Sequence, residues 1–173
     1  MYNRLLVPYD GSRPADHAMK HAFNIAKIGL LQATTTREIN LLYVVQEIHV
    51  PPSFDYGMKL YPYSLQELTK TTPEYLKEVY QDLKNKGMEM LKSKSSEYLK
   101  ESGDTAIKTH VLLGDPANKI IEFANSENID LIIIGNVGLR GISRIRALGS
   151  VSRRVSEMAS CPVLLVHYES LKN

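Results

Sequence analysis

Gly135-Asn136-Val137-Gly138 follows directly on the apolar run Leu131-Ile132-Ile133-Ile134, and after ten more residues the chain reads Gly149-Ser150-Val151-Ser152. The apolar run is typical of a buried parallel strand. Glycines after such a strand let the backbone approach a ligand and direct successive N–H groups into one concavity. The Gly-Ser pair stands where a helix should begin, and a helix N-terminus attracts anions. The pattern predicts a phosphate site; the simpler interpretation is ordinary strand-to-helix punctuation.

The segment around these glycines is basic. Between Leu131 and Ser156 there is no Asp or Glu, whereas the segment contains five arginines: Arg140, Arg144, Arg146, Arg153 and Arg154. The net charge of the whole chain is only +2, so this cluster is local and no global field attracts nucleic acid or a membrane. RNA binding is disfavoured because the chain lacks the interleaved aromatic and basic residues that RNA surfaces use.

Length and cysteine content restrict the class of protein. A chain of 173 residues fits one domain with a sizeable core. The single cysteine, Cys161, excludes an internal disulfide and favours a reducing compartment. The first apolar run, residues 5–7, is too short for a signal peptide or a membrane span, and no later stretch approaches membrane length. We expect a cytoplasmic protein.

Short apolar runs alternate with amphipathic ones along the chain. Strands are expected at residues 5–7, 39–45, 107–112, 131–134 and 163–166, with helices between them. This alternation predicts an α/β fold: a doubly wound, five-stranded parallel sheet with helices on both faces, in a single domain. Ligands of such sheets bind at the carboxyl ends of strands, where the winding reverses. The loops after the first and fourth strands share one crevice only if those strands are neighbours, which requires the order 3-2-1-4-5.

One segment interrupts this pattern. Residues 47–72 contain three prolines, Gly57 and four aromatic residues. The segment is too long for an ordinary connection and is expected to be a variable insert: a surface loop fixed by its own aromatics, or a lid or partner-binding element.

Several motifs, in one order along the chain, resemble those of the universal stress protein family. They are the opening residues 5–12, the turn Gly114-Asp115-Pro116-Ala117, the glycine motif of residues 135–152 and the ending Cys161-Pro162-Val163-Leu164-Leu165-Val166. The resemblance spans nearly the whole chain, and residues 47–72 match least. In the ATP-binding branch of the family nine residues usually separate the second glycine from the Gly-Ser pair. Here there are ten, and Gly141 offers a place to absorb the extra residue.

The resemblance implies ATP as a ligand, held mainly by backbone N–H groups. Pro8 and Asp10 would lie beside the ribose and adenine, and the backbone of Ile39 would read the adenine edge. Mg²⁺ would bridge phosphate oxygens with few protein ligands. The residues implied for the triphosphate are Gly135, Gly138, Gly149, Ser150, Val151 and Ser152.

Asp10 has two interpretations. An Asp before Gly-Ser commonly forms an Asx-turn or caps a helix. Alternatively Asp10 belongs to the nucleotide site, and because a carboxylate repels a triphosphate, that role requires Mg²⁺ or a contact to ribose.

The sequence offers no catalytic residue, because no nucleophile–base motif is visible. The leading hypothesis is a cytoplasmic, homodimeric ATP-binding protein whose nucleotide occupancy biases an unknown protein partner. A slow ATPase or autophosphorylating enzyme using Ser150 or Ser152 is an alternative, as is a dimeric scaffold that binds no nucleotide and works through the insert.

The last expected strand, Val163–Val166, lies at a sheet edge in the order 3-2-1-4-5. It is apolar on both faces and carries no charge, and an exposed edge of this kind invites aggregation. We therefore expect it to pair with its symmetry mate in a two-fold dimer, as the family resemblance also implies.

Overall fold

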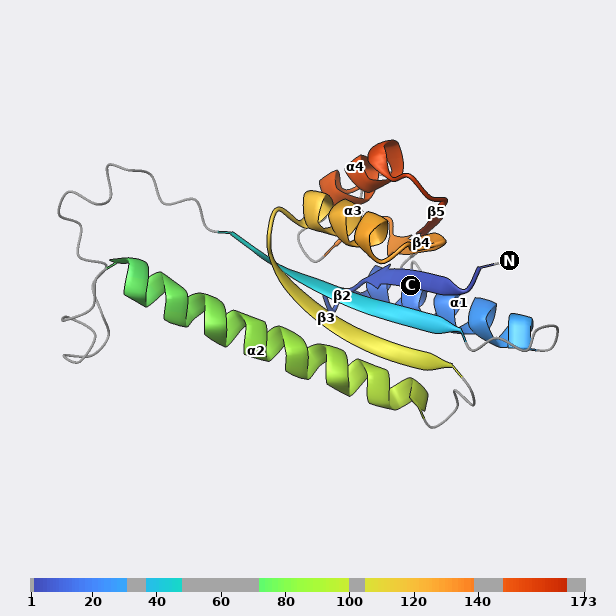
Figure 1. Ribbon diagram of the computed structural model, residues 1–173, viewed down its shortest axis with the longest axis horizontal. Helices are drawn as coiled ribbons and strands as arrows, with labels where there is room; N and C mark the ends of the chain where they lie inside the picture. Colours follow the sequence, from blue (N-terminus) through green and yellow to red (C-terminus); the bar gives the residue numbers. More distant parts are fainter. Residues whose placement is uncertain (1, 31–36, 48–71, 100–104, 139–147, 168–173) are drawn as a thin grey trace, which may run out of the picture.

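The computed structural model describes residues 2–30, 37–47, 72–99, 105–138 and 148–167. In these residues strands and helices alternate as predicted (Figure 1). The strands are β1 (Arg4–Pro8), β2 (Glu38–Gln46), β3 (Ala106–Gly114), β4 (Leu131–Gly135) and β5 (Val163–Val166), and the helices are α1 (Arg13–Leu30), α2 (Thr72–Leu99), α3 (Pro116–Ser126) and α4 (Ser150–Met158).

The five strands form one parallel sheet in the order β3-β2-β1-β4-β5, which confirms the predicted topology. β1 is central and pairs with β2 on one side and β4 on the other. The winding reverses between β1 and β4, so the loops that follow these two strands emerge side by side.

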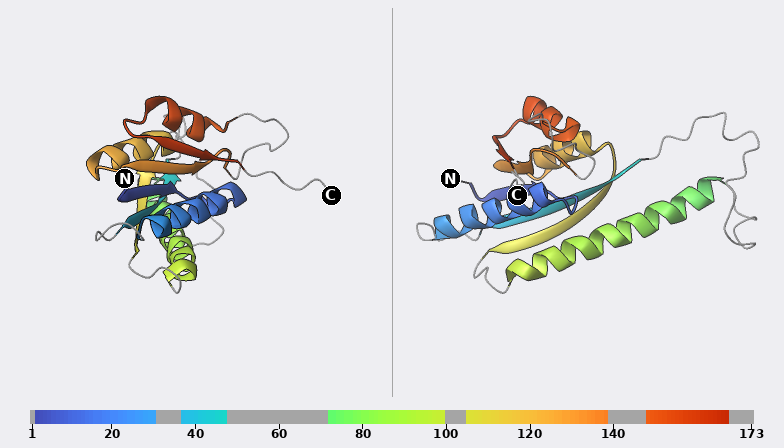
Figure 2. Two further views of the ribbon diagram at one scale, coloured as in Figure 1. Left: turned by 90° about the vertical axis from the view of Figure 1, so that its right-hand side faces the viewer. Right: turned by 180° about the vertical axis from the view of Figure 1, so that it is seen from behind.

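Each face of the sheet carries two helices. α1 and α2 cover one face, and α3 and α4 cover the other (Figures 1 and 2). Alternate residues of β1 enter the two cores: Leu5 and Val7 pack under α1, whereas Leu6 packs under α3 and α4. Burial on both faces explains why β1 and β4 are uninterrupted apolar runs.

Helix α2 runs well beyond the sheet at its amino-terminal end (Figure 2). Its close approach to the sheet depends on Gly87, because a Cβ there would lie 2.3 Å from Cδ1 of Tyr43 on β2. From Gly87 onward the helix is fixed to the core, where Leu91 is fully buried. Gly87 and Leu91 thus place the carboxyl-terminal half of α2 against the core.

A polar network crosses the sheet between β2 and β3, where the sequence suggests a wholly apolar β2. Asn40 is almost completely buried, and its Oδ1 lies 2.8 Å from Nε2 of His110. The Asn40 amide in turn donates to Glu38. Burial lowers the pKa of His110, which keeps its ring neutral in the network. This contact gives the buried Asn40 amide oxygen a partner and ties β2 to β3.

The variable insert lies almost wholly outside the described residues, since β2 ends at Gln46 and α2 begins at Thr72. Across the part of the chain that the structure describes, no helix is both long and apolar enough to cross a membrane.

Candidate functional site

The crevice is predicted at the carboxyl ends of β1 and β4, beside Pro8. The amide of Tyr9 donates to Leu42 of β2 at 2.9 Å, so the preceding residue presents its backbone nitrogen to β4. Proline has no N–H to donate there, and the ladder between β1 and β4 is formed only at the earlier residues Leu5 and Leu6. The parallel pairing of β1 with β4 therefore stops before Pro8.

Gly135, the last residue of β4, lies against the start of α1. A Cβ at this position would be 2.6 Å from Cβ of Pro14 and 2.8 Å from its carbonyl carbon. The first turn of α1 and the end of β4 are packed too closely for any side chain between them. The glycine is therefore a structural requirement of the crevice, whatever binds there.

Gly138 brings the second loop against Asp10. A Cβ on Gly138 would lie 2.6 Å from Oδ2 of Asp10, so the carboxylate occupies the space that a side chain would fill. This contact joins the loop after β1 to the loop after β4.

Asp10 also shapes its own loop. Its Oδ1 accepts a hydrogen bond from the amide of Ser12 at 3.0 Å, which is an Asx-turn. Gly11 adopts φ +80°, a left-handed conformation that favours glycine. The Ser12 hydroxyl then caps α1 by accepting from the amide of Ala15. The Asp10 carboxylate therefore orders its own turn and also lies against Gly138. The turn interpretation and the site interpretation are both compatible with this position.

The third segment, residues 149–152, is held against the β4 loop through the carbonyl of Asn136. That oxygen accepts the Gly149 amide at 2.8 Å and the Ser152 hydroxyl at 2.7 Å. A Cβ on Gly149 would lie 3.4 Å from Cα of Val137, an ordinary contact distance. The loop after β1, the loop after β4 and residues 149–152 therefore meet at the carboxyl end of the sheet.

The start of α4 is available to an anion. Its N-cap, Gly149, provides no side-chain hydrogen bond, and the first turn contains no acidic residue. The first amides of a helix have no partner within it, so those of Ser150 and Val151 remain as donors. Ser150 itself is exposed. This arrangement can bind phosphate or carboxylate oxygens.

The arginines of α4 already have carboxylate partners. Nε of Arg153 lies 3.0 Å from Glu157, and Nη1 of Arg154 lies 3.5 Å from Asp115 at the start of α3. Both arginines are exposed, so they contribute little specific affinity. The other three arginines of the basic segment, Arg140, Arg144 and Arg146, lie outside the described residues.

Two predicted site residues have other positions or contacts. Ile39 is fully buried and pairs with Leu5, three residues before the pair between Pro8 and Leu42. At about 3.3 Å per residue, it lies about 10 Å from the crevice and belongs to the core. The Ser152 hydroxyl is buried and donates its only proton to backbone carbonyls, so it cannot also donate to a ligand.

Asn136 is a component of the site that the sequence analysis missed. It is nine-tenths buried, its backbone connects β4 to α4, and its Oδ1 has no hydrogen-bond partner among the described residues. The signal in the sequence that could have identified Asn136 is a polar residue between two glycines of the motif. Buried amide oxygens are rarely left unpaired, which makes this side chain a candidate ligand contact.

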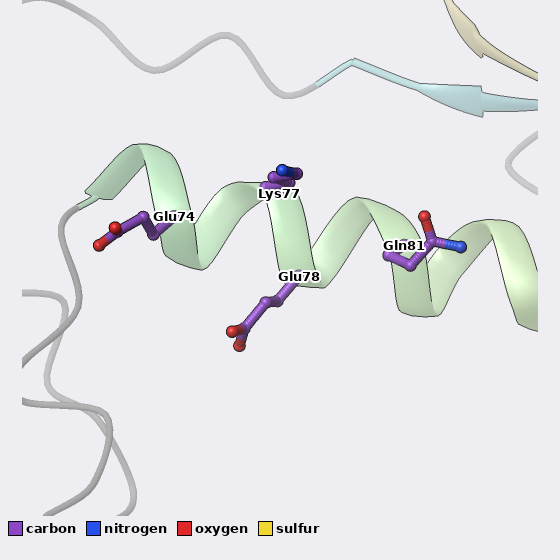
Figure 3. Close-up of a pocket in the computed structure, with 4 residues that line it drawn as sticks. All are labelled: Glu74, Lys77, Glu78 and Gln81. Atoms are coloured by element: carbon purple, nitrogen blue, oxygen red, sulfur yellow. The ribbon is translucent and has the colours of Figure 1, made fainter.

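A separate surface pocket lies along the projecting half of α2 (Figure 3). It is lined by Glu74, Lys77, Glu78 and Gln81. Lys77 and Gln81 leave the helix on one side and Glu78 on the opposite side, so the polar groups do not converge on one point. None of the predicted site residues lines it.

Comparison with known proteins identifies the family. Residues 1–167 match the universal stress protein family. This chain belongs to that family. Universal stress protein MJ0531 of Methanocaldococcus jannaschii is 36% identical over 96% of this chain and 82% of its own. Universal stress protein YxiE of Bacillus subtilis is 30% identical over 96% of this chain and 99% of its own.

Solved structures of universal stress proteins share the fold. UspA of Lactobacillus plantarum superposes with a TM-score of 0.67 at 25% identity, covering 95% of this chain and 97% of its own. Two more distant members were solved with adenine nucleotides. One, in complex with cAMP, has a TM-score of 0.57 at 23% identity and covers 96% of this chain and 97% of its own. The other, from Arabidopsis thaliana with AMP bound, has a TM-score of 0.55 at 20% identity and covers 97% of this chain and 93% of its own.

Proposed function

We propose that this universal stress protein binds ATP, with Mg²⁺, in the crevice between β1 and β4, and acts as a nucleotide-dependent regulator with little or no turnover. The observation that carries the proposal is that the loop after β4 contacts both the loop after β1, at Gly138 and Asp10, and the uncapped start of α4. That two distant members of the fold hold adenine nucleotides supports the choice of ligand class.

The contacts proposed for the nucleotide follow from these positions. Backbone amides at the start of α4 would receive the phosphates, and Pro8 would lie beside the ribose and base. Compared with the sequence-based set, Ile39 and the Ser152 hydroxyl are removed and Asn136 is added. The resulting set is Pro8, Asp10, Gly135, Asn136, Gly138, Gly149, Ser150 and Val151.

The residues present fit Mg²⁺ held mainly by phosphate. The described residues contain no cluster of three or more carboxylate, histidine or cysteine side chains suited to a metal. Asp10 lies at the crevice against Gly138 and offers one carboxylate. Mg²⁺ in nucleotide sites usually takes one or two carboxylates, with phosphates and water as its other ligands. When bound, the ion would neutralise phosphate charge that Asp10 would otherwise repel.

Nucleotide binding is tested with the purified protein. Denaturation followed by mass analysis of released small molecules should yield ATP, and added Mg-ATP should raise the melting temperature of the nucleotide-free protein. Gly149→Val should abolish the shift, since Gly149 has an extended backbone that any residue adopts and its side chain would cover the free amides. Ser156→Val, about two turns further along the exposed side of α4, is the matched control and should retain the shift. A parent protein without released nucleotide and without a shift would support the scaffold alternative.

We also propose a homodimer formed through β5. The strand is last in the sheet and, within the described residues, pairs only with β4. Leu164 on β5 is 37% exposed and Met158, at the end of the adjacent α4, is 57% exposed. An unprotected apolar edge next to exposed apolar side chains is a typical association surface.

Light scattering at micromolar concentration should give twice the mass of the chain. Leu164→Arg should shift the protein to monomer, whereas Leu99→Arg, a matched change at an exposed leucine on α2, should not. A monomeric parent would overturn the dimer. The free cysteine Cys161 suits a cytoplasmic location.

A further inference from the structure

A side-chain network connects α2 to the loop that follows β1. The Tyr9 hydroxyl donates to Oδ1 of Asp16 at 2.6 Å, and Nζ of Lys94 lies 2.9 Å from the same oxygen. Lys94 also contacts Glu97 at 2.8 Å. Tyr9 lies on the chain between Pro8 and Asp10, Asp16 is in the first turn of α1, and Lys94 is on α2. Three elements that are separate in the sequence thus meet beside the crevice.

The network is partly buried. Tyr9 is 5% exposed, the Lys94 side chain 17% and the Asp16 side chain 35%. Burial, and then the hydrogen bond to Asp16, raise the pKa of Tyr9 well above its ordinary value, so the hydroxyl remains a donor. Burial opposes the charge on Asp16, but hydrogen bonds from Tyr9 and Lys94 outweigh it and lower the pKa of that carboxyl. All three groups therefore keep fixed roles across the physiological pH range.

The same helix reaches the loop through a second contact. A Cβ on Gly11 would lie 3.0 Å from Sδ of Met90 on α2, one turn before Lys94. Gly11 is the left-handed residue of the Asx-turn that orients Asp10, and Asp10 touches Gly138. A continuous path of contacts leads from α2 through the β1 loop to the β4 loop.

We propose that Lys94 and Asp16, through the Tyr9 hydroxyl, are positioning residues that fix residues 8–12 in the geometry the nucleotide requires. This inference rests on the proposed function for its ligand, and on the contacts alone for its effect on the loop.

The test is Lys94→Met, which keeps the length of the side chain and removes its charge. Amide exchange of residues 9–12 in the nucleotide-free protein should become about tenfold faster, and the Kd for Mg-ATP should rise about tenfold. Tyr9→Phe should have a similar effect, and the double variant should be less than additive because both act through Asp16. Lys94→Arg should restore most of the loss.

Lys86→Met is the matched control. Lys86 forms an exposed pair with Asp82 on the same helix, at 2.7 Å, outside the network, and its loss should change neither readout. Loop exchange in Lys94→Met and Tyr9→Phe that equals the control would overturn the positioning role. If exchange rises but the parent binds no nucleotide, the positioning of the loop stands and the proposed function fails.

Discussion

The two walls of the crevice are built by different means. The β1 wall, residues 8–12, is held by side chains: the Asp10 turn, the Ser12 cap and the ties of Tyr9 to Asp16 and Lys94. The β4 wall is held by backbone contacts at its glycines and by the carbonyl of Asn136. Side chains can reorient when a neighbour changes, whereas a wall packed by close contact at its glycines tolerates little change. The β4 wall is therefore expected to be less tolerant of substitution than the β1 wall.

The strongest test of this difference is Gly135→Val. A side chain at this position meets the backbone of Pro14 and the amide of Ala15, neither of which is free to rotate away. The free energy of unfolding should fall by about 3 kcal/mol or more, measured by chemical denaturation. An unfolding midpoint equal to that of the parent would show that the β4 wall can move.

Ser152→Ala should have the next largest effect. It removes the buried hydroxyl that joins the start of α4 to the Asn136 carbonyl, at an expected loss of about 1–2 kcal/mol of unfolding free energy. Ser156→Ala is the control, because that hydroxyl also donates to a backbone carbonyl but is exposed. Equal losses of unfolding free energy in the two variants would mean that the buried hydrogen bond to the Asn136 carbonyl contributes no more than the exposed one.

Gly138→Ala examines the point where the walls touch. The new methyl group would meet Oδ2 of Asp10, the far end of a side chain whose Oδ1 accepts the Ser12 amide, so the carboxylate must shift and stability should fall by no more than about 1 kcal/mol. Mg-ATP affinity, measured by calorimetry, should nevertheless fall because Asp10 is displaced. Adding Asp10→Ala to Gly138→Ala should remove the steric part of the defect; an unchanged affinity in the single variant would argue against a role for this contact.

The smallest expected effect is a loss of stability at acidic pH. Asp16 has a folded pKa below its unfolded value, so its contribution to stability is present at neutral pH and is lost as the pH falls through the folded pKa, below about pH 4. Asp16→Asn should be less stable than the parent at pH 7, and the difference in melting temperature should shrink towards pH 3. A difference in melting temperature that does not depend on pH would show that Asp16 is not ionised in its contact with Tyr9 and Lys94.

Much of the fold was predictable because its signals are local. Apolar runs flanked by Pro, Gly and Asp located β1, β4 and β5. The turn Asp115-Pro116 stands at the start of α3, where Asp115 accepts the Asn118 amide as an N-cap. Parallel strands with short connections admit few topologies, so the order followed once the two loops were required to share a crevice.

The errors arose where the answer depended on register or on spatial neighbours. The position of Ile39 relative to Pro8 depends on how β2 pairs with β1, which no local pattern records. The partner of the Ser152 hydroxyl is a carbonyl sixteen residues away. Asn40 also interrupts a strand that reads as apolar, because His110 on β3 satisfies its amide oxygen.

The sequence by itself determined the parallel sheet, the glycine segments and their meeting at a helix start, since each of these follows from short-range chemistry of strands, turns and helix termini. The tertiary structure alone decided which groups face the crevice. It placed the carboxylate of Asp10 against Gly138, although the basic segment around that glycine contains no acidic residue. It also brought Lys94 to Asp16 and Tyr9, a contact between residues 78 positions apart that arises only when α2 packs beside α1 on the finished sheet.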